Sequence, residues 1–174
     1  NIFTVDGIMD KSKRFVAILM GSDSDLATMS AAIDILERFG ITQEVHIMSA
    51  HRTPEETANY VRDADRRGCE VFIAGAGLAA HLAGAVAAQT LKPVIGVPLD
   101  AGALGGMDAL LSTVQMPGGI PVACVAIGKP GAKNAGYLAA QILALGDSEV
   151  AQQIKSEREA NRDLVLKKDA ELTR

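Results

Sequence analysis

The sequence predicts an α/β protein of three layers, in which a central parallel sheet of five strands lies between helices, with one further helix at the C-terminus. Short apolar runs such as Phe15–Met20 are continuous rather than alternating, as expected of strands buried on both faces of a parallel sheet. Segments with apolar residues at helical spacing, such as Leu26–Phe39, separate these runs, which is typical of consecutive βαβ units.

The predicted elements follow one another without interruption. The helix Leu26–Phe39 is ended by Gly40, and the next helix begins with Thr53 as its N-cap, Pro54 at the first helical position and Glu56 completing a capping box. With right-handed crossovers, the pattern corresponds to a flavodoxin-like sandwich. The other expected elements are strands at Val45–Met48, Val71–Ala74, Val94–Val97 and Val122–Ile127, and helices at His81–Thr90, Asp108–Val114 and Asn134–Leu145.

The two ends of the chain fall outside this repeating pattern. Residues 1–14 have no continuous apolar stretch typical of a secretory signal, and we expect them to be a disordered leader before the α/β domain at residues 15–146. Residues 147–174 form a charged helical extension with few apolar positions. We expect its apolar residues, Val150 and Ile154 among them, to pack on a neighbouring subunit; a frayed surface helix is the alternative.

Composition excludes several classes of function. A net charge of −4 and a pI near 5.4 argue against a nucleic-acid surface, which needs clustered Lys and Arg. No apolar run approaches the ~18 residues of a membrane span. The two cysteines are Cys69, just past a helix end, and Cys124, in a predicted buried strand. Their spacing is not that of metal ligands, so we expect no metal site. We expect both to be reduced thiols in a cytoplasmic protein.

Three loops that follow predicted strands carry the polar and small residues of the chain. They are Gly21–Asp25, Ser49–Pro54 and Gly75–His81. In an open parallel sheet, ligands bind outside the carboxyl ends of the strands, where the strand order reverses. The sequence therefore predicts one small-molecule site at this edge, for a compound that carries a phosphate.

The first two loops offer different chemistry. Ser22 lies beside a helix N-terminus, which favours phosphate, whereas Asp25 is suited to accept hydrogen bonds from ribose hydroxyls; plain helix capping by Ser24 or Asp25 is the alternative. Arg52 can clamp a phosphate through its planar fork of donors. His51 offers a ring nitrogen that can accept a proton. A surface Arg and a packed His remain the alternative for this loop.

The third loop consists largely of small residues. Gly75, Ala76 and Gly77 would let a ligand approach the backbone closely. His81 follows near the start of a helix, where packing on the rim of the site is the alternative to a functional role. His46 alternates with apolar residues along a strand and is expected to be an ordinary polar-face residue.

Two non-enzymatic functions share this sheet. A receiver-type signalling domain would place Lys-Pro after the fifth strand, as Lys129-Pro130 does, but it needs an Asp at the end of the third strand, where this chain has Ala74-Gly75. A flavin-binding electron carrier needs aromatic residues around the ring. Aromatics make up only 3% of the chain, and both tyrosines fall outside the three loops.

The ordered set of motifs resembles the class I 5-(carboxyamino)imidazole ribonucleotide mutase family. The resemblance covers about Phe15 to Leu145, and the residues that carry it are Gly21–Asp25, Ser49–Pro54, Ala74–Leu82, Val114–Gly119 and Ala126–Lys129. It implies an isomerase of purine biosynthesis that forms 4-carboxy-5-aminoimidazole ribonucleotide by decarboxylation and recapture of carbon dioxide. It also implies a homo-octamer and no metal or organic cofactor.

The resemblance implies a role for each matching position. His51 would be catalytic, as a proton donor and then acceptor, and the residues in contact with substrate would be Ser22, Asp25, Ser49, Ala50, Arg52, Gly75, Ala76, Gly77, His81 and Leu82. Arg rather than Lys after His51 favours the mutase over the alternative, a class II carboxylase that uses free carbon dioxide. Two positions depart from the family pattern: Leu78 replaces a usual Gly, and Ala83 a usual Pro. We expect Leu78 to narrow the cavity or to have a strained backbone.

Overall fold

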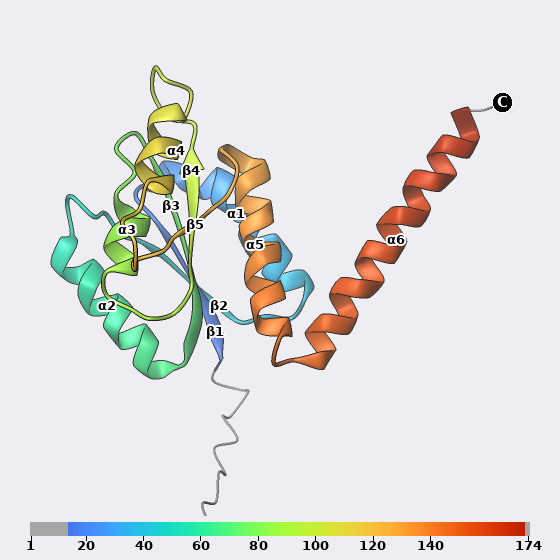
Figure 1. The fold of residues 1–174 in the computed structure, drawn as a ribbon, viewed down its shortest axis with the longest axis horizontal. Coiled ribbons are helices and arrows are strands. Elements are labelled where there is room, and N and C mark those ends of the chain that lie inside the picture. The colour runs from blue at the N-terminus through green and yellow to red at the C-terminus, as the bar shows by residue number, and fades with distance from the viewer. Residues whose placement is uncertain (1–13, 173–174) are drawn as a thin grey trace, which may run out of the picture.

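A computed structural model describes residues 14–172, so residues 1–13 of the expected leader lie outside the described part. Five parallel strands form one sheet in the order β2-β1-β3-β4-β5, which confirms the predicted architecture (Figure 1). The strands are β1 (Phe15–Met20), β2 (Gln43–Ile47), β3 (Cys69–Gly77), β4 (Val94–Leu99) and β5 (Ala123–Cys124). The helices are α1 (Leu26–Arg38), α2 (Pro54–Arg67), α3 (Leu82–Ala87), α4 (Met107–Val114), α5 (Gly128–Ala144) and α6 (Ser148–Leu172).

The two faces of the sheet are covered by different helices. All six residues of β1 are buried, and their side chains alternate between two apolar clusters. Val16, Ile18 and Met20 join α1 and α5 on one face, whereas Ala17 and Leu19 join α2 and α3 on the other. Burial on both faces is the reason that the strands read as continuous apolar runs.

Element boundaries differ from the prediction mainly at the far edge of the sheet. β5 has two residues instead of the expected six at Val122–Ile127, because only Ala123 and Cys124 pair with β4. α5 begins at Gly128 rather than Asn134, so Lys129 and Pro130 lie in its first turn, where a proline is tolerated. Cys124 is half-buried, not buried as expected.

The start of α6 packs on its own chain, which corrects the expectation for Val150 and Ile154. Ile154 is buried in the cluster formed with α1 and α5, and Val150 packs against that cluster. Glu157 accepts hydrogen bonds from Arg38 and from the hydroxyl of Tyr137. Beyond these contacts α6 projects away from the body of the molecule (Figure 1). No helix within residues 14–172 is long and apolar enough to span a membrane.

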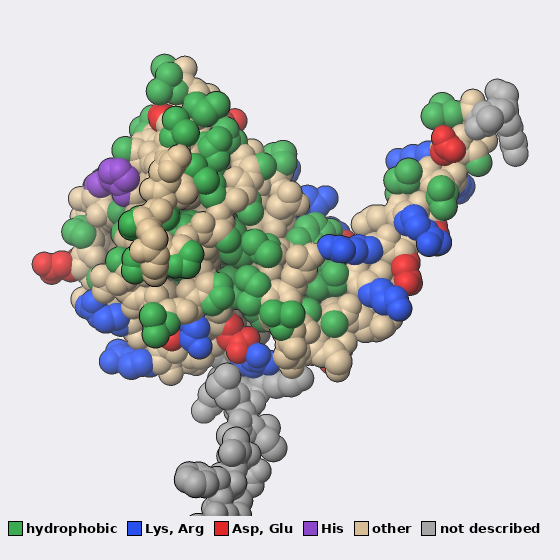
Figure 2. All heavy atoms as spheres, viewed as in Figure 1, with side chains coloured by type: hydrophobic (Ala, Val, Ile, Leu, Met, Phe, Trp, Pro, Cys, Tyr) green, Lys and Arg blue, Asp and Glu red, His purple; other side chains and the backbone are tan. Residues whose placement is uncertain are grey.

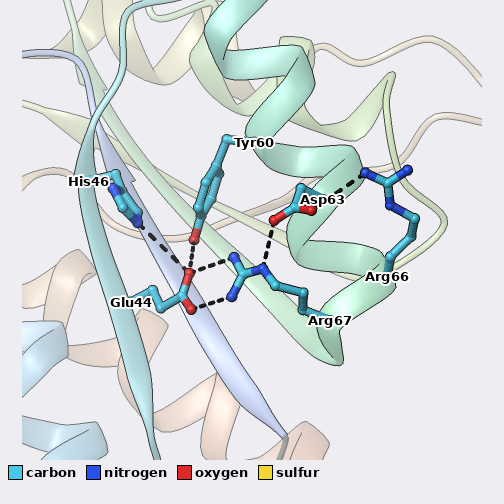
Figure 3. A network of polar contacts seen from close by, with 6 residues as sticks. All are labelled: Glu44, His46, Tyr60, Asp63, Arg66 and Arg67. Carbon is cyan, nitrogen blue, oxygen red and sulfur yellow. Dashed lines mark hydrogen bonds and ion pairs between the residues drawn. The ribbon is translucent and has the colours of Figure 1, made fainter.

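A polar network joins β2 to α2 at the other edge of the sheet (Figure 3). The carboxylate of Glu44 accepts hydrogen bonds from Arg67, with Nη2 at 2.8 Å, and from the hydroxyl of Tyr60 at 2.9 Å. Arg67 also binds Asp63 one turn earlier in α2. His46 lies 3.8 Å from Glu44, so it belongs to this network, in keeping with its predicted polar-face position. The hydrogen bonds from Arg67 lower the pKa of Glu44 from its usual 4.5 to about 2.

This pKa predicts a pH-dependent contribution of Glu44 to stability. Because the folded-state pKa is depressed, the contribution is complete above about pH 4.5 and disappears as the pH falls to about 2. We expect Glu44→Gln to lower the free energy of unfolding at pH 7 by about 1 kcal/mol, as for a partly exposed ion pair. Urea unfolding from pH 7 to pH 2.5 should show the difference shrinking below pH 4.5. The control Glu171→Gln, on exposed α6, should follow the wild type; a constant difference for Glu44→Gln would contradict the prediction.

Candidate functional site

A cavity of about 500 Å³ lies at the carboxyl ends of the strands. The strand order reverses between β1 and β3, and the loops that follow β1, β2 and β3 supply most of the cavity wall. This is the position predicted for a ligand in an open parallel sheet. Of the residues predicted to contact a ligand, the lining contains Ser22, Asp25, Ser49, Ala50, His51, Arg52, Ala76, Gly77, His81 and Leu82.

The loop after β1 is a single turn of 3-10 helix, Asp23–Asp25, with Ser22 as its N-cap. The Ser24 amide donates to Ser22 Oγ at 3.4 Å, and the Ser22 amide donates to Asp25 Oδ2 at 3.0 Å. Asp25 thus caps this turn, as one of the two alternatives proposed, while it also lines the cavity. Burial raises the pKa of Asp25, and the hydrogen bonds from the Ser22 and Gly21 amides oppose this shift.

The loop after β2 is fixed by Ser49 and Thr53. The Ser49 amide donates to Thr53 Oγ1 at 2.9 Å, and Thr53 Oγ1 donates to the Ser49 carbonyl at 3.1 Å. Thr53 precedes α2 as predicted, but its side chain turns back to Ser49, so the expected capping box with Glu56 is wrong. This reciprocal pair closes the loop and holds Ala50, His51 and Arg52 at the cavity.

Arg52 reaches from this loop to the end of β1. Its Nη2 donates to the Gly21 carbonyl at 2.7 Å, and its amide donates to Ser49 Oγ at 3.1 Å. Arg52 also lines a second hollow of about 410 Å³, shared with Ser22, Ser49 and Thr53. The guanidinium therefore stands where two hollows meet, among serine hydroxyls, which is a suitable place for a phosphate group.

The two histidines of the site form a pair. His51 Nε2 lies 2.7 Å from His81 Nδ1, and the rings meet edge to face with their centroids 4.8 Å apart. One nitrogen of the two must donate and the other accept, depending on the tautomers. Both side chains are exposed and line the cavity. Sequence analysis assigned each histidine to the site but did not predict that they are bonded to each other. Their direct hydrogen bond offers a path for a proton between the loops that follow β2 and β3.

The opposite wall of the cavity is built from small and apolar residues. Ala76, Gly77, Leu78, Ala79 and Leu82 come from the end of β3 and the start of α3, and Ala101 comes from the loop after β4. Sequence reasoning missed Ala101, which lies outside the three loops that it singled out. The predicted strain at Leu78 is confirmed, because its φ is +56°.

Gly75 does not line this cavity. It is buried, and a Cβ built on it would lie 2.4 Å from Met29 Sδ of α1. The glycine therefore makes room for packing between α1 and β3 rather than for a ligand. Among residues 14–172, no group of three or more His, Cys, Asp and Glu side chains could hold a metal ion.

The chain is similar to proteins of one family over most of its length. The family model described as AIR carboxylase matches residues 15–163. Two proteins named N5-carboxyaminoimidazole ribonucleotide mutase illustrate the similarity. The protein from Synechocystis sp. is 54% identical over 166 residues, covering 95% of this chain and 93% of its own. The protein from Escherichia coli K12 is 53% identical over 151 residues, covering 87% and 89%.

The likeness extends to three-dimensional structure. The crystal structure of Treponema denticola PurE superposes with a TM-score of 0.84 at 33% sequence identity, covering 92% of this chain and 99% of that one. This match supports the predicted flavodoxin-like arrangement of the sheet and its helices.

Proposed function

Because this chain belongs to the AIR carboxylase family, we propose that it is an isomerase that converts 5-(carboxyamino)imidazole ribonucleotide into 4-carboxy-5-aminoimidazole ribonucleotide in purine biosynthesis. The observation that carries the proposal is the His51–His81 pair, 2.7 Å apart, at a cavity whose other walls are polar on one side and apolar on the other. A carboxyl transfer between two atoms of one substrate is served by a histidine pair that exchanges protons, a polar wall that binds the ribose phosphate, and an apolar wall that holds carbon dioxide.

The polar wall fits the ribose and phosphate of the substrate. Arg52 with Ser22 and Ser49 would hold the phosphate, and Asp25 would accept hydrogen bonds from ribose hydroxyls. The raised pKa of Asp25 reflects its burial, a cost that hydrogen bonds from ribose would offset. With the phosphate fixed by Arg52, the imidazole ring of the substrate would extend toward the histidines and the small residues.

The reaction needs two proton transfers, one to the substrate and one from it. A proton delivered to the exocyclic nitrogen lets its bond to the carbamate carbon break, which leaves an amine and carbon dioxide. The electron-rich ring carbon then attacks the carbon dioxide, and the new C–C bond leaves a proton on that carbon to be removed. His51 would donate the first proton and accept the second, so that the enzyme returns to its starting state. His81, hydrogen-bonded to His51, would orient its ring during both steps.

The apolar wall would hold the carbon dioxide between the two steps. Ala76, Ala79 and Leu82 offer neither a nucleophile nor a strong hydrogen-bond partner in their side chains. Gly77 fits closely against Ala101, since a Cβ at Gly77 would lie 2.7 Å from the Ala101 Cβ. We propose that the reaction needs no metal or organic cofactor, because proton transfer and confinement supply the required chemistry.

We also propose that the protein is a cytoplasmic homo-octamer. Apolar side chains remain exposed on the outer half of α6 and on α4 with its preceding loop (Figure 2). Such patches are typical of protein interfaces. The residues are Leu164, Val165 and Leu166 on α6, and Leu104, Met107, Leu111 and Val114 around α4. The unpaired thiols Cys69 and Cys124 support a reducing compartment.

We expect His51→Asn to reduce turnover by at least about a hundredfold, because the substituted side chain cannot exchange the proton. Binding of the ribonucleotide product, measured by calorimetry, should stay close to wild type. By contrast, we expect Arg52→Ala to weaken binding of the ribonucleotide product, because this substitution removes the contact with the phosphate. The matched control for His51→Asn is His46→Asn, because His46 belongs to the network of Figure 3 and does not line the cavity. Turnover near wild type in His51→Asn would remove His51 from catalysis.

An isotope experiment separates the mutase from the class II alternative. Substrate with a labelled carbamate carbon is converted in buffer with unlabelled bicarbonate and carbonic anhydrase. We expect the product to keep the label, because carbon dioxide is released and recaptured inside one cavity. A product whose carboxyl group comes from bicarbonate, with 5-aminoimidazole ribonucleotide serving equally well as substrate, would establish the carboxylase instead.

The assembly is tested by removing residues 160–174. This deletion keeps Val150, Ile154 and Glu157, which pack on the body of the chain, and removes the exposed apolar residues of α6. We expect light scattering to detect assemblies smaller than an octamer. The control Arg162→Gln, within the same segment, should leave the mass unchanged. An intact octamer after the deletion would show that the outer half of α6 is not an interface.

A further inference from the structure

Thr53 stands at the N-terminus of α2, yet its hydroxyl does not cap that helix. A threonine in this position usually accepts a hydrogen bond from an amide of the first helical turn. In this chain the side chain of Thr53 forms no such bond. Its Oγ1 instead accepts from the Ser49 amide at 2.9 Å and donates to the Ser49 carbonyl at 3.1 Å. The hydroxyl therefore stabilises the preceding loop rather than the helix.

The bonds between Thr53 and Ser49 close the loop that carries the charged and titratable residues of the site. The Thr53 amide also donates to the Ser49 carbonyl, at 2.9 Å, so Thr53 binds both polar groups of the Ser49 backbone. Because one hydroxyl donates and accepts at the same time, rotation of the Ser49 backbone would break at least one of these bonds. Ala50, His51 and Arg52 lie between the two closing residues, and their positions depend on this closure.

Ser49 in turn orients the guanidinium of Arg52. Ser49 Oγ accepts from the Arg52 amide at 3.1 Å and from Arg52 Nε at 3.4 Å. Arg52 Nη2 donates to the Gly21 carbonyl at 2.7 Å. Two of the five N–H groups of the guanidinium are used in these bonds, and the others are available to a phosphate. The hydroxyl of Thr53 thus acts on Arg52 through Ser49.

The position of His51 depends on the same closure. The ring of His51 is exposed, and its Nε2 lies 2.7 Å from Nδ1 of His81, the residue before α3. Proton exchange is sensitive to such geometry, since a misplacement of about 1 Å can cost about a hundredfold in rate. Thr53 lines the second hollow and not the cavity of the two histidines. It can therefore influence His51 through the loop, without contact with the reacting atoms.

We propose that Thr53 is a positioning residue: its hydroxyl holds the loop after β2 so that Arg52 and His51 keep one fixed spacing. The inference rests on the proposed function. A substrate held at its phosphate by Arg52 meets His51 at its imidazole ring. The spacing of the two residues therefore decides whether the reacting nitrogen and carbon lie within reach of the histidine. The hydroxyl of Thr53 forms no bond with the substrate and remains unchanged through the reaction.

The test begins with the loss of the hydroxyl alone. Thr53→Val keeps the shape of the side chain, and we expect its turnover number to fall at least about tenfold, a part of the loss that misplacement by about 1 Å can cause. The dissociation constant of the ribonucleotide product, measured by calorimetry, should rise by a similar factor. Thr53→Ser keeps the hydroxyl, so both quantities should stay within about threefold of wild type. Thr53→Ala should behave as Thr53→Val does, and it replaces that variant if the valine protein fails to fold.

A double-mutant cycle tests whether Thr53 acts on the phosphate through Arg52. In the Arg52→Ala background, Thr53→Val should raise the dissociation constant of the product by about threefold or less, because the side chain that Thr53 orients is absent. A loss of stability without a positioning role would weaken binding equally in both backgrounds. An equal rise would therefore contradict the inference.

The matched control is Thr90→Val, in the connection between α3 and β4. The Thr90 hydroxyl also donates and accepts at once, to Asp65 Oδ2 at 2.8 Å and from the Lys92 amide at 3.0 Å. Thr90 lies outside both hollows, so its turnover and product binding should equal those of wild type. Equal losses in this control, or wild-type turnover and binding in the folded Thr53→Val protein, would overturn the inference and leave the mutase intact. A wild-type protein that does not convert the carbamate ribonucleotide would overturn the proposed function itself.

Discussion

The parallel pairing of β1 with both β2 and β3 is the constraint on which the rest of this structure depends. β1 is the strand at which the sheet order reverses, so the chain leaves it toward β2 and later returns to β3 on its other side. The carboxyl ends of the three strands therefore meet at one edge. Serine, arginine and histidine side chains that are far apart in sequence come together there without any need for a long or unusual loop.

A few hydrogen bonds then fix the positions of the loops at this edge. Arg52 donates to the Gly21 carbonyl, which ties the loop after β2 to the end of β1, and Ser49 and Thr53 close the same loop from within. The His51–His81 hydrogen bond ties that loop to the start of α3. The polar wall is thus held by hydrogen bonds and the apolar wall by close van der Waals contact, which suits a rigid phosphate and a small neutral molecule respectively.

Sequence reasoning predicted the strands at the centre of the sheet because burial on both faces leaves a continuous apolar run, as at Phe15–Met20. It predicted β5 poorly, since only two residues pair with β4 and the apolar run does not show how far the pairing extends. Most candidate site residues lie at the cavity because the loops after parallel strands share an edge. Thr53 was misassigned because its side chain bonds back to the Ser49 backbone rather than forward to α2. Gly75 and Ala101 were misassigned or missed because their roles depend on tertiary neighbours, Met29 and Gly77. Spacing along the chain carries no information about such partners.

The close fit of glycine to a neighbouring side chain has a consequence for how this protein can evolve. Gly75 lies against Met29, Gly77 against Ala101, and Gly102 against Leu78, and in each pair one residue leaves the volume that the other fills. A larger residue at one position is tolerable only after its partner has become smaller. Substitutions in these loops are therefore epistatic, and their acceptable order is restricted. At Gly77, a larger residue becomes tolerable in the background of a smaller residue at position 101, whereas Gly102 has a φ of +74° that disfavours any side chain, whatever space Leu78 leaves.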